Sequence, residues 1–325
     1  MYNILRMSFT KEMHNGVAVY HVDKIIPDNR MEKIVNTKLR RSQIKLIVDH
    51  DADVYSGDGK LLLKFRKSVL PNNHVKDFYD NVLKFAKNVS SNRGNATGSK
   101  SKNVRDNPKV MSNIFGYFDR WSPIQNYIFT KKNKRPLVNV RECKFNMDYP
   151  ELYKKTIPLI QDIDRYYKRY APSYYEKQRQ KAHQTHFKIP NTTFTTITTN
   201  VNYQTTVHTD QGDDIEGFGN LAVIEEGEYD GGETCFPQYG IGVDVRTNDL
   251  LFMDVHQWHA NLPIVLKTPD AIRLSIVCYL RKGVWEKTKN KPKSFFVKHN
   301  KTVKKLRAVK TDSKLSPIDT DYLKK

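Results

Sequence analysis

The chain has 325 residues, of which 38% are hydrophobic and 11% aromatic, so it is long enough to bury a sizeable core. Its 55 Lys and Arg against 35 Asp and Glu give a net charge of +20, which favours polyanionic partners such as nucleic acid over a charge that merely keeps the protein soluble. Three cysteines without a CxxC pair exclude a disulfide framework and a structural zinc site, and no segment approaches the roughly 20 apolar residues of a membrane span, so we expect a soluble intracellular protein.

Residues 1–86 are expected to form an N-terminal α/β extension. Within it, residues 53–69 are typical of two short strands around a Ser-Gly-Asp-Gly turn, and residues 75–86 place apolar side chains close to helical spacing. Residues 87–108 consist mostly of Asn, Ser, Gly and Lys. We interpret them as a basic flexible loop that contacts nucleic acid, although a plain linker would have the same composition.

Residues 109–287 are predicted to form the main domain. A helical pattern over 149–170 ends before Pro172, and it indicates a helix that packs against the domain as a buttress. From residue 192 onward, short β-branched and aromatic runs alternate with turn residues, which favours an antiparallel sandwich or barrel. The fold class is therefore mainly β with flanking α-helices. Residues 288–325 carry 12 Lys or Arg against 3 Asp and are expected to form a basic C-terminal tail, flexible or partly helical.

A candidate metal site begins at His208-Thr209-Asp210. Residues i and i+2 of a strand share a face, so His208 and Asp210 can bind one ion together. His259 follows a second apolar strand and is the candidate third ligand. Two imidazoles and one carboxylate leave positions open for O₂ and a 2-oxo acid, the arrangement of non-haem Fe(II) oxygenases. His256 is an alternative, but alternation along that strand turns it away from His259.

Arg273 begins the run RLSIVCYL and is predicted to be buried. A buried guanidinium needs an anionic partner, and the far carboxylate of 2-oxoglutarate would accept two hydrogen bonds from it. Ser275 faces the same side and can add a hydrogen bond. An ordinary salt bridge would be the structural alternative for Arg273. Together, H-x-D, then His, then R-x-S predict a dioxygenase that uses Fe(II) and 2-oxoglutarate.

The segments HTDQGD, YDGGETCFPQY, DVHQWHANLPI and IRLSIVCYL resemble the TET/JBP family of nucleobase dioxygenases. HTDQGD is similar to the J-binding-protein side of that family, and the Arg-x-Ser strand with Tyr279 is similar to the TET side. The resemblance implies a double-stranded β-helix (jelly-roll-like) core, Fe(II), 2-oxoglutarate, O₂ and a nucleic-acid substrate, with His208, Asp210 and His259 on the metal and Arg273 on the co-substrate.

Two positions depart from the TET pattern. Where TET enzymes carry an Asn and a His that touch the base, this chain has Asp213 and Arg281. The pair could contact the edge of a flipped pyrimidine, or could form a salt bridge at the mouth of the site. Asp213 slightly favours thymine over 5-methylcytosine, because a carboxylate accepts from thymine N3–H.

The predicted reaction is hydroxylation of the 5-methyl group of a pyrimidine in DNA, coupled to decarboxylation of 2-oxoglutarate to succinate. Such an enzyme would be nuclear or otherwise associated with DNA in a eukaryotic or viral setting. The rival interpretations are a dioxygenase of the same core that acts on a protein side chain, such as a prolyl hydroxylase, or on RNA. A catalytically inactive nucleic-acid-binding protein is disfavoured by the intact set of His208, Asp210, His259 and Arg273.

Overall fold

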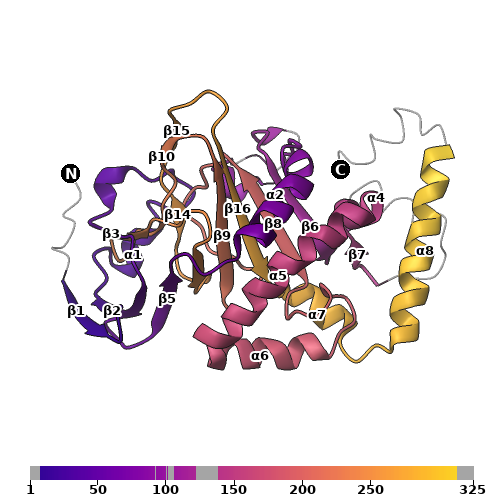
Figure 1. The fold of residues 1–325 in the computed structure, drawn as a ribbon, viewed down its shortest axis with the longest axis horizontal. Helices are drawn as coiled ribbons and strands as arrows, with labels where there is room; N and C mark the ends of the chain where they lie inside the picture. Colours follow the sequence, from indigo (N-terminus) through magenta and orange to yellow (C-terminus); the bar gives the residue numbers. More distant parts are fainter. Residues whose placement is uncertain (1–7, 92, 100, 102–105, 122–137, 313–325) are drawn as a thin grey trace.

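The structure, a computed structural model, describes residues 8–91, 93–99, 101, 106–121 and 138–312 (Figure 1). Its strands are β1 (Phe9–His14), β2 (Val17–Val22), β3 (Leu46–Val48), β4 (Ala52–Ser56), β5 (Leu61–Arg66), β6 (Ser112–Phe118), β7 (Arg141–Glu142), β8 (Thr196–Val201), β9 (Gly219–Glu226), β10 (Tyr229–Gly231), β11 (Thr234–Phe236), β12 (Ile241–Val243), β13 (Leu250–Met253), β14 (Ala260–Asn261), β15 (Ile264–Leu266) and β16 (Ile272–Tyr279). The helices are α1 (Asp28–Met31), α2 (Asn72–Ala86), α4 (Lys144–Asp148), α5 (Pro150–Tyr170), α6 (Pro172–His183), α7 (Lys282–Thr288) and α8 (Lys293–Asp312).

Two sheets pack against each other at the centre of the molecule. The larger has ten strands in the order β1-β2-β4-β5-β13-β9-β16-β8-β6-β7, and the smaller has the order β14-β11-β12-β3. Most pairs are antiparallel; β2 with β4 and β12 with β3 are parallel. Side chains of both sheets, among them Leu251, Phe236 and Ile241, share one buried apolar cluster. The mainly β architecture with outer helices agrees with the prediction.

The N-terminal extension continues the main sheet. The predicted strands around Ser-Gly-Asp-Gly are β4 and β5, and Gly59 takes a φ of 81° in the turn between them, a conformation that glycine adopts without steric cost. β5 then pairs directly with β13 of the main domain. The extension and the domain that carries the candidate site are therefore one hydrogen-bonded unit.

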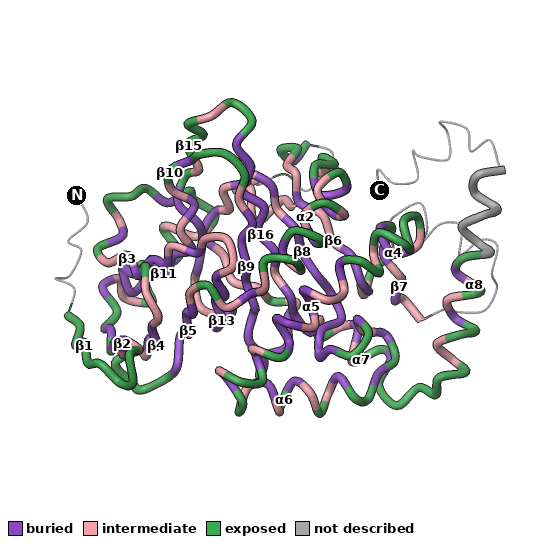
Figure 2. Tube along the Cα trace, in the orientation of Figure 1, coloured by how far each residue is buried: buried purple, intermediate pink, exposed green. Residues whose placement is uncertain are grey.

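Helices α2, α4, α5 and α6 cover one face of the large sheet, and each has buried residues in the apolar cluster on that face (Figure 2). The predicted helix over 75–86 is α2, and the predicted helix over 149–170 is α5. The helical run breaks at Ala171, and Pro172 begins α6 because its fixed φ suits a first helical position. Helix α5 buries Leu159, Ile160 and Ile163, so it is the expected buttress.

The two basic segments contain more packed structure than composition indicated. In the described part of residues 87–108, Ser90 pairs with Val110, and the carbonyl of Ala96 accepts a hydrogen bond from the Tyr203 hydroxyl at 2.6 Å. At the C-terminal end, Thr288 and His299 are buried, and α8 extends to residue 312. Residues 313–325 lie outside the described part. Composition could not reveal this packing because only a few side chains in each segment carry it.

The three cysteines are free and buried, as expected of small apolar side chains without a disulfide. Within the described part of the chain, no helix combines the length and the apolar character that crossing a membrane requires.

One hydrogen bond links the buttress to the start of β9. The Tyr167 hydroxyl accepts from the backbone N–H of Phe218 at 2.9 Å, and both residues are buried. Tyr167→Phe should lower the free energy of unfolding by about 1–3 kcal/mol, because the N–H would stay buried without a partner. Tyr166→Phe is the matched control, since that ring is only half-buried. Urea denaturation of both variants measures the difference, and equal stabilities would contradict the assigned hydrogen bond.

Candidate metal centre and co-substrate pocket

The backbones of His208 and His259 bind each other directly. The N–H of His208 donates to the carbonyl of His259 at 3.0 Å, and the N–H of His259 donates back at 2.9 Å. This isolated bridge places the two imidazole rings 4.5 Å apart between centroids. The sequence argument expected His208 within a strand; the structure instead has it in an irregular segment after β8, held by this bridge.

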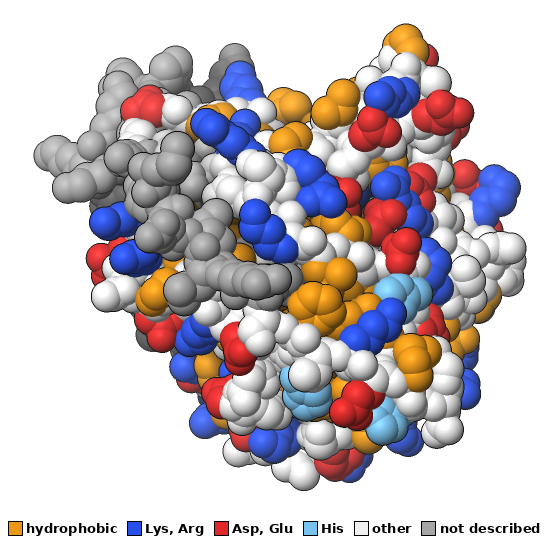
Figure 3. Space-filling model, turned by 90° about the vertical axis from the view of Figure 1, so that its left-hand side faces the viewer, with side chains coloured by type: hydrophobic (Ala, Val, Ile, Leu, Met, Phe, Trp, Pro, Cys, Tyr) orange, Lys and Arg blue, Asp and Glu red, His pale blue; other side chains and the backbone are white. Residues whose placement is uncertain are grey.

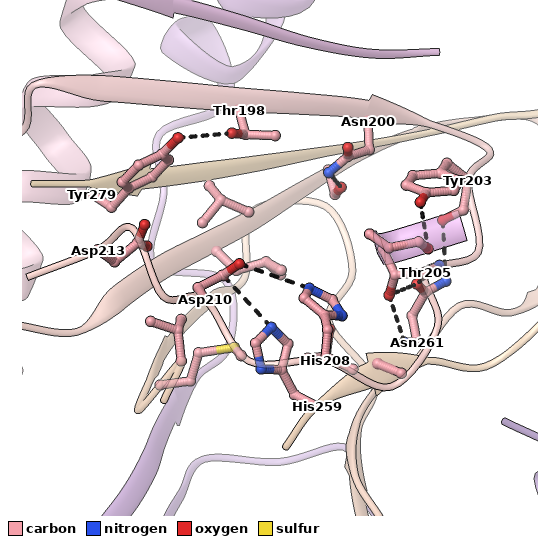
Figure 4. Close-up of a pocket in the computed structure, with 18 of the residues that line it drawn as sticks. Thr198, Asn200, Tyr203, Thr205, His208, Asp210, Asp213, His259, Asn261 and Tyr279 are labelled. Carbon is pink, nitrogen blue, oxygen red and sulfur yellow. Dashed lines mark hydrogen bonds and ion pairs between the residues drawn. The ribbon is translucent and has the colours of Figure 1, made fainter. Parts of the chain in front are cut away.

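Asp210 completes a cluster of three possible metal ligands. Its backbone N–H donates to the carbonyl of Val255 at 2.9 Å, which turns the carboxylate toward both imidazoles (Figure 4). The Asp210 oxygens lie 3.8 Å from His208 Nε2 and 3.7 Å from His259 Nε2. One ligand atom from each residue falls within 4.8 Å of the others, so a single ion can contact all three.

Both histidines present the nitrogen that an ion would need. His208 Nδ1 lies 2.6 Å from the carbonyl of Thr206, and His259 Nδ1 lies 2.9 Å from the carbonyl of Gln257. A carbonyl only accepts, so each Nδ1 carries a proton, and in the neutral ring the lone pair is then on Nε2, which faces Asp210. Burial, with a smaller contribution from His208, lowers the pKa of His259 to about 4. His259 is therefore neutral near pH 7, the form in which imidazole binds metals.

His256 points elsewhere. Its ring Nε2 lies 3.3 Å from the carbonyl of Asp214, and its backbone N–H donates to the Asp254 carboxylate at 3.0 Å. A turn that follows β13, closed by the N–H of Gln257 on the carbonyl of Asp254, separates the two histidines. The structure thus brings His259, and not His256, to His208 and Asp210. The two histidines point apart because a turn lies between β13 and His259, and not because they alternate along a strand as expected.

Strand β16 divides its side chains between the pocket and the core. Arg273, Ser275, Val277 and Tyr279 line the pocket that also contains the three-residue cluster. The alternate residues Leu274, Ile276 and Cys278 belong to the apolar cluster under α2 and α5. Alternation along a strand makes this division. The predicted pair Arg273 and Ser275 therefore shares one cavity with His208, Asp210 and His259.

Arg273 is a buried cation. Only 4% of its surface is exposed, and among the ion pairs formed by the described residues none includes it. Burial lowers the pKa of its guanidinium, because the low-polarity surroundings disfavour the charge. Gly232, with φ of 80°, lies against this side chain: a Cβ there would come within 2.6 Å of Arg273 Nε. The absence of a side chain at Gly232 thus makes room for the guanidinium.

Asp213 and Arg281 both line the pocket, and their backbones form a bridge, but they are not an ion pair. Arg281 Nε donates to the Asp119 carboxylate, and its guanidinium lies 4.2 Å from the centroid of the Phe118 ring. The alternative of an Asp213–Arg281 salt bridge is therefore wrong, since Asp119 on the segment after β6 takes that place. Burial raises the pKa of the Asp213 carboxyl well above its usual value, and the nearby Asp210 adds to the shift.

Tyr279, the third predicted substrate residue, is buried beside Asp213. Its hydroxyl lies 3.3 Å from Thr198 Oγ1, and burial raises its pKa to about 12.

Sequence reasoning missed Arg93, which enters the same pocket from the segment expected to be flexible. Arg93 Nη2 donates to Thr198 Oγ1 at 3.2 Å, and its Nε donates to Ser112 Oγ at 2.8 Å. Only the fold could reveal this, because 115 residues separate Arg93 from His208.

Asn261 and Asn200 were missed as well. Asn261 accepts from both the N–H and the hydroxyl of Thr205, at 2.8 and 2.9 Å, and so fixes the chain just before His208 (Figure 4). Asn200 Nδ2 donates to Ser275 Oγ at 3.2 Å. The alternation of Thr198 and Asn200 in the run TTITTNV was the one signal in the sequence that pointed to Asn200.

This donor set fits the cofactors predicted from the sequence. Two imidazoles and a carboxylate on one side of a cavity suit Fe(II) and leave its other positions to ligands. A buried guanidinium in the same cavity suits a second carboxylate, which 2-oxoglutarate has.

Comparisons with known proteins agree with this chemistry. Residues 125–282, just under half of the chain, match the family model described as the oxygenase domain of the 2OGFeDO superfamily, Tet_JBP. Bifunctional helicase and thymine dioxygenase JBP2 of Leishmania braziliensis is 34% identical over 144 residues, which are 44% of this chain and 13% of that protein. Thymine dioxygenase JBP1 of Trypanosoma brucei brucei is 30% identical over 178 residues, 54% of this chain and 20% of that protein.

The chain thus spans less than a third of the length of these curated relatives. Among solved structures, NgTET1 in complex with 5mC DNA superimposes with a TM-score of 0.50 at 15% identity, over 81% of this chain and 88% of that one. This likeness in fold confirms the predicted double-stranded β-helix core. The resemblance to the TET/JBP family that the motifs predicted is therefore confirmed for the part of the chain that carries His208, Asp210, His259 and Arg273.

Proposed function

We propose that the protein is an Fe(II)- and 2-oxoglutarate-dependent dioxygenase that hydroxylates the 5-methyl group of a pyrimidine in DNA, with thymine as the preferred base. The observation that carries the proposal is the shared cavity: three possible iron ligands and a buried guanidinium outside any described ion pair line one pocket. Neither feature alone would separate a dioxygenase from another metal protein. Together they accommodate a metal and a dicarboxylate side by side.

Each residue has a defined task in this proposal. His208, Asp210 and His259 hold the metal through Nε2 and carboxylate atoms whose orientation the backbone fixes. Arg273 and Ser275 bind the far carboxylate of 2-oxoglutarate. Bound iron would supply the activation of O₂ that couples decarboxylation of 2-oxoglutarate, to succinate and CO₂, with hydroxylation of a C–H bond. Tight packing around Arg273 keeps water from competing for the guanidinium.

The substrate half of the proposal concerns Asp213 and Tyr279 at the end of the pocket away from Arg273. The methyl group of a stacked base cannot reach a metal inside the pocket, so the base would have to leave the duplex. Asp213 keeps an oxygen that can accept from thymine N3–H whether or not it is protonated. The proposal of thymine is further supported by the curated relatives, which are named thymine dioxygenases.

The first prediction concerns the metal. His208→Ala, Asp210→Ala and His259→Ala should each abolish 2-oxoglutarate turnover and weaken Mn(II) binding measured by titration, because each removes one of only three protein ligands. His256→Ala is the matched control and should retain both, since that ring bonds to the Asp214 carbonyl instead. Equal loss in a folded His256→Ala protein would show that the third ligand is misassigned.

The second prediction concerns the co-substrate. Arg273→Lys should raise the KM for 2-oxoglutarate by about tenfold to a hundredfold, because an ammonium cannot reproduce the two parallel hydrogen bonds of a guanidinium. Arg66→Lys is the control, since Arg66 is equally buried but pairs with Asp53. Steady-state succinate release measures both variants. A KM that changes less than about twofold in Arg273→Lys would assign Arg273 a purely structural role.

The third prediction concerns the base. On DNA that contains both thymine and 5-methylcytosine, the protein should form mainly 5-hydroxymethyluracil. Asp213→Asn should shift products toward 5-hydroxymethylcytosine, because an amide offers an N–H donor to cytosine N3 at any pH, whereas the carboxyl of Asp213 donates only when it is protonated and repels that lone pair when it is ionised; a polar pair of this kind discriminates by about 1–3 kcal/mol. Nucleosides are quantified by mass spectrometry after digestion. If only 5-hydroxymethylcytosine forms, thymine is the wrong base. If turnover proceeds without either product, the protein-side-chain or RNA interpretation replaces this one.

A further inference from the structure

Residues 30–45 run beside the segment that leads into His208. The N–H of Asn36 donates to the carbonyl of Val207 at 2.8 Å, and the N–H of Val207 donates to the carbonyl of Thr37 at 2.9 Å. Gln204 Nε2 adds a bond to the carbonyl of Leu39 at 3.1 Å. These three bonds tie residues 30–45 to the backbone that carries the first candidate iron ligand.

This segment is strongly basic. It carries one acid, Glu32, against six cations, all of them exposed: Arg30, Lys33, Lys38, Arg40, Arg41 and Lys45. Among the ion pairs of the described residues, none includes any of the six, whereas Lys24 and Lys76 nearby in sequence each pair with an aspartate four residues on. The charge of residues 30–45 is therefore not neutralised within the described part of the molecule.

Buried apolar side chains also anchor residues 30–45 to the protein core. Met31, Leu39 and Ile44 are buried in an apolar cluster that includes Val207 and Ala260, each of which precedes or follows a candidate iron ligand. The six cations thus sit on a backbone that is anchored at both ends and in the middle. Lys and Arg side chains lie among acidic and apolar ones on the face that carries α1 and β3 (Figure 3). The backbone positions of the six cations relative to the metal site are set by the packing and hydrogen bonds of residues 30–45.

We propose that residues 30–45 form a docking surface for the phosphate backbone of duplex DNA, which holds the strand beside the pocket while one base occupies it. The inference rests on the proposed function. A flipped base stays covalently attached to its strand, so the backbone must be gripped close to the pocket mouth. Cations outside any described ion pair suit this task, because bonds to phosphate position a duplex without reading its sequence.

The test compares two triple variants with equal loss of charge. Lys33→Ala/Lys38→Ala/Arg40→Ala removes three cations of the docking surface. Lys144→Ala/Lys155→Ala/Lys168→Ala removes three exposed cations from α4 and α5, the helices on the sheet face opposite the pocket. No described ion pair involves any of these six side chains, so both variants should fold. Fluorescence anisotropy with a labelled duplex gives affinity and its salt dependence, and succinate release without DNA reports on the metal site.

We expect the docking-surface variant to bind duplex about tenfold or more weakly than the control variant at 0.15 M salt. The slope of log affinity against log salt should fall by about 0.9 for each phosphate that the variant no longer neutralises, hence by up to about 3. Turnover of 2-oxoglutarate without DNA should stay unchanged in both. If both triple variants bind duplex equally weakly, the effect is one of net charge and the docking surface is refuted. If the unmodified protein turns over 2-oxoglutarate but neither binds nor oxidises DNA, the proposed substrate fails instead.

Discussion

The reciprocal backbone pair between His208 and His259 is the interaction on which the rest of the site depends. It joins segments 51 residues apart, so the backbone of one histidine cannot move without that of the other. Carbonyls of the same two segments, at Thr206 and Gln257, then fix which nitrogen of each ring carries the proton. Position and protonation are thus both set by the main chain, and the ion-binding atoms are preorganised before any ion arrives.

Strand β16 connects this centre to the hydrophobic core. Leu274, Ile276 and Cys278 pack beneath α2 and α5, and this packing fixes the register of the strand. A shift by one residue would turn those apolar groups into the pocket and bury Arg273 against the helices. The packing of the hydrophobic core, which stabilises the fold, therefore also keeps the Arg273 guanidinium in the cavity that contains the two histidines. Stability and the geometry of the site depend on one choice of register.

This dependence explains what the sequence could predict. His208 and Asp210 lie at the end of a strand-like run, His259 comes shortly after the apolar run 249–255, and Arg273 begins the run RLSIVCYL. Local patterns were therefore sufficient to propose these four residues as candidates. Arg93 could not be found in this way, because its segment lacks periodicity and reaches the pocket only through hydrogen bonds with Ser112 and Thr198. The same holds for residues 1–86: their strands were predictable, but the pairing of β5 with β13 joins distant segments of the chain.

The cations around the pocket differ in how their charge is compensated, and this difference limits what each can bind. Arg281 is held by Asp119 and lies over the Phe118 ring, so part of its hydrogen-bonding capacity is already used. Arg273 and Arg93 have no carboxylate partner among the described residues, and Arg93 donates only to hydroxyls there. A buried guanidinium without an anion is costly, and a ligand that supplies one recovers that cost on binding. The pocket therefore favours an anionic ligand at Arg273, whereas Arg281, already neutralised, can at most share its remaining N–H groups with a neutral base edge.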